Sequence, residues 1–141
     1  MDKTQLAIET FQELNCSQSV ISAFANDLHL DQETALKITS GFGGGMACGE
    51  TCGAVTGAYM VIGLKHGHSS NDPDAKAATK EKIRRFSHLF TQTHGSLVCK
   101  ELLGINISTP EGNVEAKERD LFHTHCPRFI ETACRIIEKE F

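Results

Sequence analysis

Cys52-Gly-Ala-Val-Thr-Gly-Ala-Tyr-Met-Val-Ile-Gly-Leu64 is the stretch of sequence that decides the fold. It is apolar and rich in small residues, and it follows a break at Gly41-Phe-Gly-Gly-Gly45. We predict a helix from about Glu50 to Leu64, with Gly53 and Gly57 forming a G-x-x-x-G face. Glycine inside a helix costs up to ~1 kcal/mol, so we expect close approach of neighbouring backbones to compensate. This predicts a central helix with Cys52 buried in the middle of a bundle.

Helical periodicity continues on both sides of this segment, and alternating strand patterns are nearly absent. Residues that favour helix N-caps occur at Asp31, Asp72, Ser96 and Thr109, and Gly95 and Gly104 are suited to helix C-termini. A first helix containing Leu6 is expected to stop around Asn15. The remaining helices are expected over residues 17–28, 31–38, 72–93, 96–103 and 109–122, and from Cys126 nearly to the C-terminus. The fold class is therefore predicted to be all-α, a compact and irregular bundle of six to eight helices in a single domain, residues 1–141.

Apolar side chains predict which face of each helix is buried. In the first helix the predicted core stripe consists of Leu6, Phe11 and Leu14. In the third helix the apolar residues Ala35, Leu36 and Ile38 follow the Asp31 cap. The predicted core stripe of the long helix consists of Ile83, Phe86 and Phe90.

Composition excludes several classes of protein. Hydrophobic residues make up 40% of the chain and charged residues 23%, which is typical of a globular domain. The net charge of −4 argues against nucleic acid as a partner, because phosphate binding needs a basic face. No apolar run approaches the ~20 residues of a membrane helix, and the N-terminus lacks the features of a signal peptide. We therefore expect no membrane association and a cytoplasmic location.

The chain contains six cysteines, an unusually high number for a protein of the reducing cytoplasm, where structural disulfides are disfavoured. No two have the C-x-x-C spacing of thioredoxins or zinc ribbons. Four of them, Cys16, Cys52, Cys99 and Cys126, lie at predicted helix N-termini. Free N–H groups and the helix dipole stabilise a thiolate there, so a lowered pKa is expected. Thiolates attack disulfides and bind metals, which favours a chemical role for these four.

The other two cysteines and the histidines carry weaker signals. Cys134 lies among the apolar residues of the last helix and is expected in the core. Cys48 precedes Cys52 by four residues and shares its face if the helix already includes it. His66-x-His68 and His123-x-His125 have spacing suitable for zinc ligands, although both pairs lie near predicted turns.

The cysteine and glycine pattern resembles the C-GCAxxG-C-C family of redox-active proteins, defined by a CGAxxG motif and separated single cysteines. Cys52-Gly-Ala-Val-Thr-Gly57 matches the motif, and Cys16, Cys99 and Cys126 look like the other family cysteines. The resemblance covers nearly the whole chain. A similar helical module is associated with split-Soret cytochromes, where cysteines hold an iron–sulfur cluster, although the C-x-x-C-H haem motif is missing here.

These observations leave several functions open. In the first, Cys16, Cys52, Cys99 and Cys126 converge on one site and bind an iron–sulfur cluster for electron transfer or redox sensing. In the second, cysteine pairs cycle between thiol and disulfide without metal, with Cys52 as the nucleophile. The third is a structural zinc site or binding module, and the fourth is a set of inert thiols. An enzyme would be a thiol–disulfide or electron-transfer oxidoreductase. The sequence does not identify the redox partner. It also leaves open a homodimer whose two subunits share the cofactor.

Overall fold

The computed structural model describes residues 2–141 and confirms the all-α fold class. Within these residues the chain forms nine α-helices and one π-helical turn, and the only β-type pairing is a single bridge between Thr51 and Val98. The helices are α1 (Lys3–Thr10), α2 (Cys16–Ala25), α3 (Gln32–Thr39), α4 (Gly53–His66), α5 (Pro73–His94), α6 (Cys99–Leu103), α7 (Pro110–Glu118), α8 (Leu121–Thr124) and α9 (Cys126–Glu140), with the π turn η1 (Gly45–Gly49) before α4.

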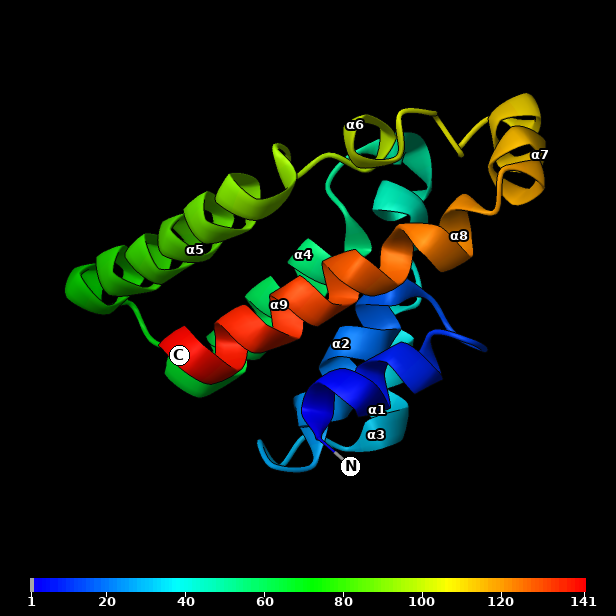
Figure 1. The fold of residues 1–141 in the computed structure, drawn as a ribbon. Helices are drawn as coiled ribbons and strands as arrows, with labels where there is room; N and C mark the ends of the chain where they lie inside the picture. Colours follow the sequence, from blue (N-terminus) through cyan, green and yellow to red (C-terminus); the bar gives the residue numbers. More distant parts are fainter. Residues whose placement is uncertain (1) are drawn as a thin grey trace.

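Helix α4 is the centre of the bundle, as the glycine-rich sequence predicts. It packs against α2, α5 and α9, and α9 also contacts α1, α2 and α5 (Figure 1). Small residues make this packing close: a Cβ added at Gly57 would lie 2.9 Å from the carbonyl oxygen of Ser17 and 3.2 Å from Cβ of Val20. The G-x-x-x-G face therefore lies directly against the backbone of α2.

Most predicted helix ends are confirmed because their signals are local. Asp31 caps α3 by accepting from the Thr34 backbone N–H. Asp72 and Thr109 cap α5 and α7, each followed by proline. Gly95 and Gly104 end α5 and α6 in left-handed conformations, with φ of 85° and 71°.

Other boundaries were predicted wrongly. The first helix ends at Thr10 rather than near Asn15. Ser96 does not cap α6, because the N-cap is Val98. The stretch 109–122 divides into α7 and α8 at Asp120, whose φ is 56°, so the bundle has nine helices among the described residues instead of six to eight.

Part of the predicted core is also corrected. Phe86 and Phe90 are fully buried, but Leu6, which was expected in the core stripe of the first helix, is 41% exposed. Helix α1 instead buries Thr4 and Ala7. Helix α3 buries Ala35 and Thr39. None of the helices within residues 2–141 combines the length and the apolar character needed to cross a bilayer.

Candidate functional site: four cysteines around one cavity

The four cysteines selected from the sequence line the same cavity, which has a volume of about 160 Å³. It lies where the first residues of α2, α4, α6 and α9 meet. Figure 1 shows these helix starts gathered on the side of the molecule where α6 and α8 lie. The rest of the lining is almost entirely apolar, and consists of Phe11, Asn15, Gly44, Gly53, Leu102, Leu103, Ile107, Phe122 and Phe129.

The predicted position of these cysteines at helix starts is confirmed. Cys16, Cys99 and Cys126 are the first residues of α2, α6 and α9, and Cys52 is the N-cap of α4. The start of α2 is fixed by a capping box, in which Asn15 Oδ1 accepts from the Gln18 N–H at 2.8 Å. The Asn15 side chain also donates to the carbonyl of Ser40 at 3.1 Å.

A short backbone pairing holds Cys52 and Cys99 beside each other. The Cys52 N–H donates to the carbonyl of Leu97 at 2.8 Å, and the Cys99 N–H donates to the carbonyl of Glu50 at 2.6 Å. These two hydrogen bonds flank the bridge between Thr51 and Val98. Residues 50–52 and 97–99 are therefore fixed to one another, although they are far apart in sequence.

Cys16 reaches Cys52 because Gly53 has no side chain. A Cβ atom at Gly53 would overlap the sulfur of Cys16, which lies against the first turn of α4. The side chains of Cys16 and Cys52 line the same cavity, and each shifts the pKa of the other. The motif glycine thus leaves room for direct contact between two thiols of different helices.

The four thiols differ in their tendency to ionise. The hydrogen bond from Cys52 is the largest influence on Cys16 and lowers its pKa to about 7, and the backbone N–H groups of Gly44 and Ser17 act in the same direction. The same contact, together with burial, raises the pKa of Cys52 well above its usual range. Burial raises the pKa of Cys99 to about 11 and the pKa of Cys126 to about 12.

The expectation of a lowered pKa at all four helix starts is therefore correct for Cys16 alone. Desolvation disfavours the charged thiolate, and at Cys99 and Cys126 this effect exceeds that of the helix N-terminus. The lowered pKa falls on Cys16, and not on Cys52, which was expected to be the nucleophile. The role of Cys52 as nucleophile stays a prediction.

Cys48 and Cys134 lie outside the cavity lining. Cys134 is completely buried in the core on α9, as predicted, and burial raises its pKa to about 12. Cys48 is exposed on η1, where its thiol donates to the carbonyl of Gly45 at 3.3 Å. Because α4 begins only at Gly53, Cys48 and Cys52 do not share a helix face, and the premise for pairing them is wrong.

The histidine pairs also lie elsewhere. His66 bonds to the carbonyl of Phe141 at 2.9 Å, and His123 lies 2.6 Å from the carboxylate of Asp120. None of the four histidines of the two pairs belongs to the cavity lining. Within residues 2–141 no three His, Cys, Asp or Glu side chains are grouped as ligands of a single metal ion.

The aromatic part of the lining was missed by sequence reasoning. Phe11, Phe122 and Phe129 come from three separate segments, and no local pattern connects them with the cysteines. Asn15 carried a usable signal, because Asn15-x-x-Gln18 has the spacing of a capping box directly before Cys16.

Residues 14–140 match the family described as "Putative redox-active protein (C_GCAxxG_C_C)". The chain belongs to this family. The match spans all four cavity cysteines and the Cys52–Gly57 motif, and the family description supports a redox role in general terms. No curated protein and no solved structure matches the chain.

Proposed function

We propose that Cys16, Cys52, Cys99 and Cys126 hold an iron–sulfur cluster, and that this C_GCAxxG_C_C family member transfers electrons or senses redox state through it. The observation that carries the proposal is the placement of four thiols, each from a different helix, around one apolar cavity. Four cysteine thiolates are the usual ligands of [2Fe–2S] and [4Fe–4S] centres.

The size and surface of the cavity fit such a group. A water molecule needs roughly 10–15 Å³ of comparable space, so the volume of about 160 Å³ is many times larger. Close packing leaves few spaces of this size inside proteins. The apolar walls, among them Phe11, Ile107 and Phe129, would limit the access of water to the cofactor.

A cluster also suits thiols that come from four separate helices. It distributes its thiolates over several irons, whereas one zinc ion needs all its ligands within about 2.0–2.3 Å of one point. The four cysteines of this chain line one shared cavity.

The protein's own groups prepare the site for thiolate ligands. The backbone N–H groups of Gly44 and Ser17 lower the pKa of Cys16, and those of Ala54 and Val55 act in the same direction on Cys52. Hydrogen bonds from such groups stabilise thiolates and tune the potential of a bound cluster. The cluster would supply one-electron transfer. Cys99 and Cys126 must lose protons to become ligands, so assembly should be favoured by higher pH.

The position of the Cys16 sulfur beside Gly53, in the cavity that Cys52 also lines, favours a second candidate function, thiol–disulfide exchange without metal. The Cys16 thiolate would attack a disulfide in a partner and form a mixed disulfide, releasing one partner thiolate. Cys52 would then lose its proton and attack Cys16, releasing the second partner thiolate. The products are a Cys16–Cys52 disulfide and the reduced partner, so two electrons pass from this chain to the partner.

Metal and thiol analysis of protein purified without oxygen separates these functions. The cluster proposal predicts bound iron and acid-labile sulfide, with the visible absorbance of an iron–sulfur centre. Colourless, metal-free protein that loses two thiols on oxidation and regains them on reduction would instead support thiol–disulfide exchange. Stoichiometric zinc without thiol cycling would contradict both.

A further inference from the structure

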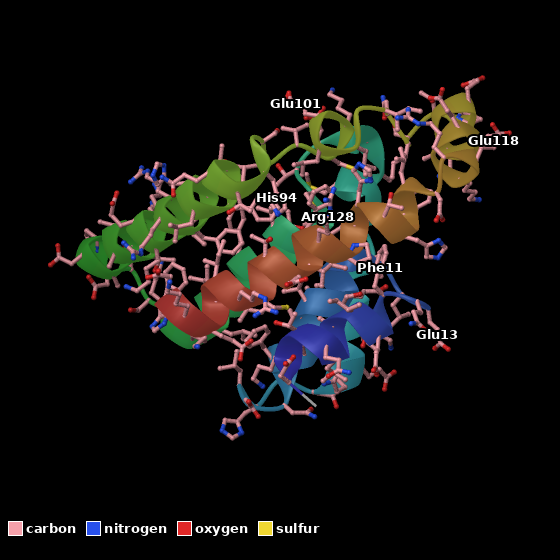
Figure 2. All side chains as sticks on the ribbon, in the orientation of Figure 1. Phe11, Glu13, His94, Glu101, Glu118 and Arg128 are labelled. Atoms are coloured by element: carbon pink, nitrogen blue, oxygen red, sulfur yellow. The ribbon has the colours of Figure 1, made fainter. Side chains whose placement is uncertain are left out.

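A groove on the surface lies next to the cysteine cavity. It has a volume of about 370 Å³ and is formed by the end of α1 and the following residues together with α8 and the start of α9. Figure 2 shows Glu13 of this segment extending away from the body of the molecule. Most of the groove is apolar, and its apolar lining consists of Ile8, Phe11, Leu14, Phe122 and Pro127.

The groove and the cavity share a wall. Phe11 and Phe122 line both spaces, and both are only partly buried. Cys16 and Cys126 follow closely after the groove residues Leu14 and Phe122 in the sequence. Phe11 and Phe122 thus form a wall that the cysteine cavity and the surface groove share. Electron tunnelling slows exponentially with distance. A wall shared by the cavity and the groove therefore favours electron transfer from the cysteine centre to a partner bound in the groove.

The groove lining carries one carboxylate, that of Glu13, and the described lining residues include neither lysine nor arginine. His123 also belongs to the groove, but its ring lies 2.6 Å from the carboxylate of Asp120, which offsets any positive charge it carries. An apolar floor with an acidic edge complements a partner with an apolar patch and a basic rim.

We propose that this groove is the docking site for a small electron-transfer protein whose redox group is exposed inside an apolar patch with a positively charged rim. The proposal rests on the proposed redox function of the cysteine centre. One electron leaves that centre across the wall of Phe11 and Phe122, and the redox group of the partner is reduced by one electron. The contact is expected to be of the weak, transient class that buries less than about 1,200 Å².

Cytochrome c is a suitable probe, because its exposed haem edge lies within a rim of lysines. We would titrate isotope-labelled protein, both metal-free and loaded, with cytochrome c at low ionic strength and follow amide shifts by NMR. Shifts are expected to concentrate in residues 8–14 and 122–127. Glu13→Lys should weaken binding about fivefold or more, and added salt should weaken binding to the wild type.

Glu118→Lys is the matched control, because Glu118 is also exposed and lies at the end of α7, outside the groove (Figure 2). It should leave the affinity for cytochrome c within about twofold, as expected for an exposed charge away from the interface. Absence of binding, shifts confined to another face, or equal effects of the two substitutions would overturn the docking proposal. The metal-free titration separates this outcome from failure of the cluster proposal, which is decided by iron and sulfide content alone.

Discussion

At the scale of single residues, Cys16 stands apart from the other three cavity cysteines. It is the one thiol of the four whose pKa is lowered, to about 7, because Cys52 donates a hydrogen bond to it. The metal-free site at neutral pH therefore holds one partly ionised thiol among three protonated ones. The order in which the cavity cysteines are alkylated therefore tests whether Cys16 and Cys52 lie side by side.

Alkylation of the metal-free protein should follow this order. Because the pKa of Cys16 is lowered, its thiolate forms as the pH rises through about 7, whereas Cys99 and Cys126 need pH values of about 11 and 12. Mass-spectrometric mapping of iodoacetamide labelling against pH measures each midpoint. Cys52→Ala removes the hydrogen bond and should raise the Cys16 midpoint towards about 8.5. Cys48→Ala should leave it unchanged. A wild-type midpoint at or above the ordinary thiol value would contradict the Cys16–Cys52 contact.

Gly53 and Gly63 form a natural pair for testing the close packing of α4. A Cβ at Gly53 would overlap the Cys16 sulfur and lie 3.0 Å from the Phe42 carbonyl, whereas a Cβ at Gly63 meets nothing within 4 Å. Gly63→Ala should therefore stabilise the fold by up to about 1 kcal/mol through helix propensity. Gly53→Ala should destabilise it, because overpacking typically costs about 1–3 kcal/mol. Urea unfolding measures both free energies, and equal stabilities would refute the proposed role of Gly53.

At the scale of secondary-structure elements, local signals predicted most helix starts, although α4 and α6 begin later than expected. Asp72 and Thr109 were identified because a cap is formed by residues only two or three positions apart. The irregular turn η1 before α4 was not predicted, since Met46 and Ala47 have left-handed φ values of 60° and 59°. Non-glycine residues avoid this conformation unless the surrounding structure imposes it.

The cap of α2 connects helix stability with cysteine reactivity. Asn15→Ala removes the hydrogen bond to the Gln18 N–H and the hydrogen bond to the Ser40 carbonyl. It should lower the free energy of unfolding by about 1–2 kcal/mol. The first turn of α2 supplies N–H groups to the Cys16 sulfur, so its fraying should also raise the alkylation midpoint of Cys16.

Thr109→Ala is the control for this change, because Thr109 caps α7 through the Gly112 N–H at 3.0 Å and lies outside the cavity. Thr109→Ala should lower the free energy of unfolding by about 1 kcal/mol and leave the pH midpoint of Cys16 alkylation unchanged. If both substitutions shifted the midpoint equally, or neither did, the cap of α2 would not be controlling the site.

At the scale of the whole molecule, the sequence identified the site cysteines more readily than their surroundings. The positions of Cys16, Cys52, Cys99 and Cys126 at helix starts were predictable, because helix starts are local features. Their common cavity follows from packing between α2, α4 and α9 and from the pairing of residues 50–52 with 97–99. Burial depends on these same contacts, which is why the raised pKa values of Cys99 and Cys126 could not be predicted from sequence.

The central claim is that four specific cysteines bind one iron–sulfur centre, and single cysteine substitutions test it most directly. Each of the six cysteines would be changed to serine, and iron and sulfide per chain would be measured after anaerobic reconstitution. Substitution of Cys16, Cys52, Cys99 or Cys126 should abolish or strongly reduce cluster content, whereas Cys48→Ser and Cys134→Ser should retain it in folded protein. Full cluster content in any of the first four variants, or its loss on changing exposed Cys48, would contradict the claim.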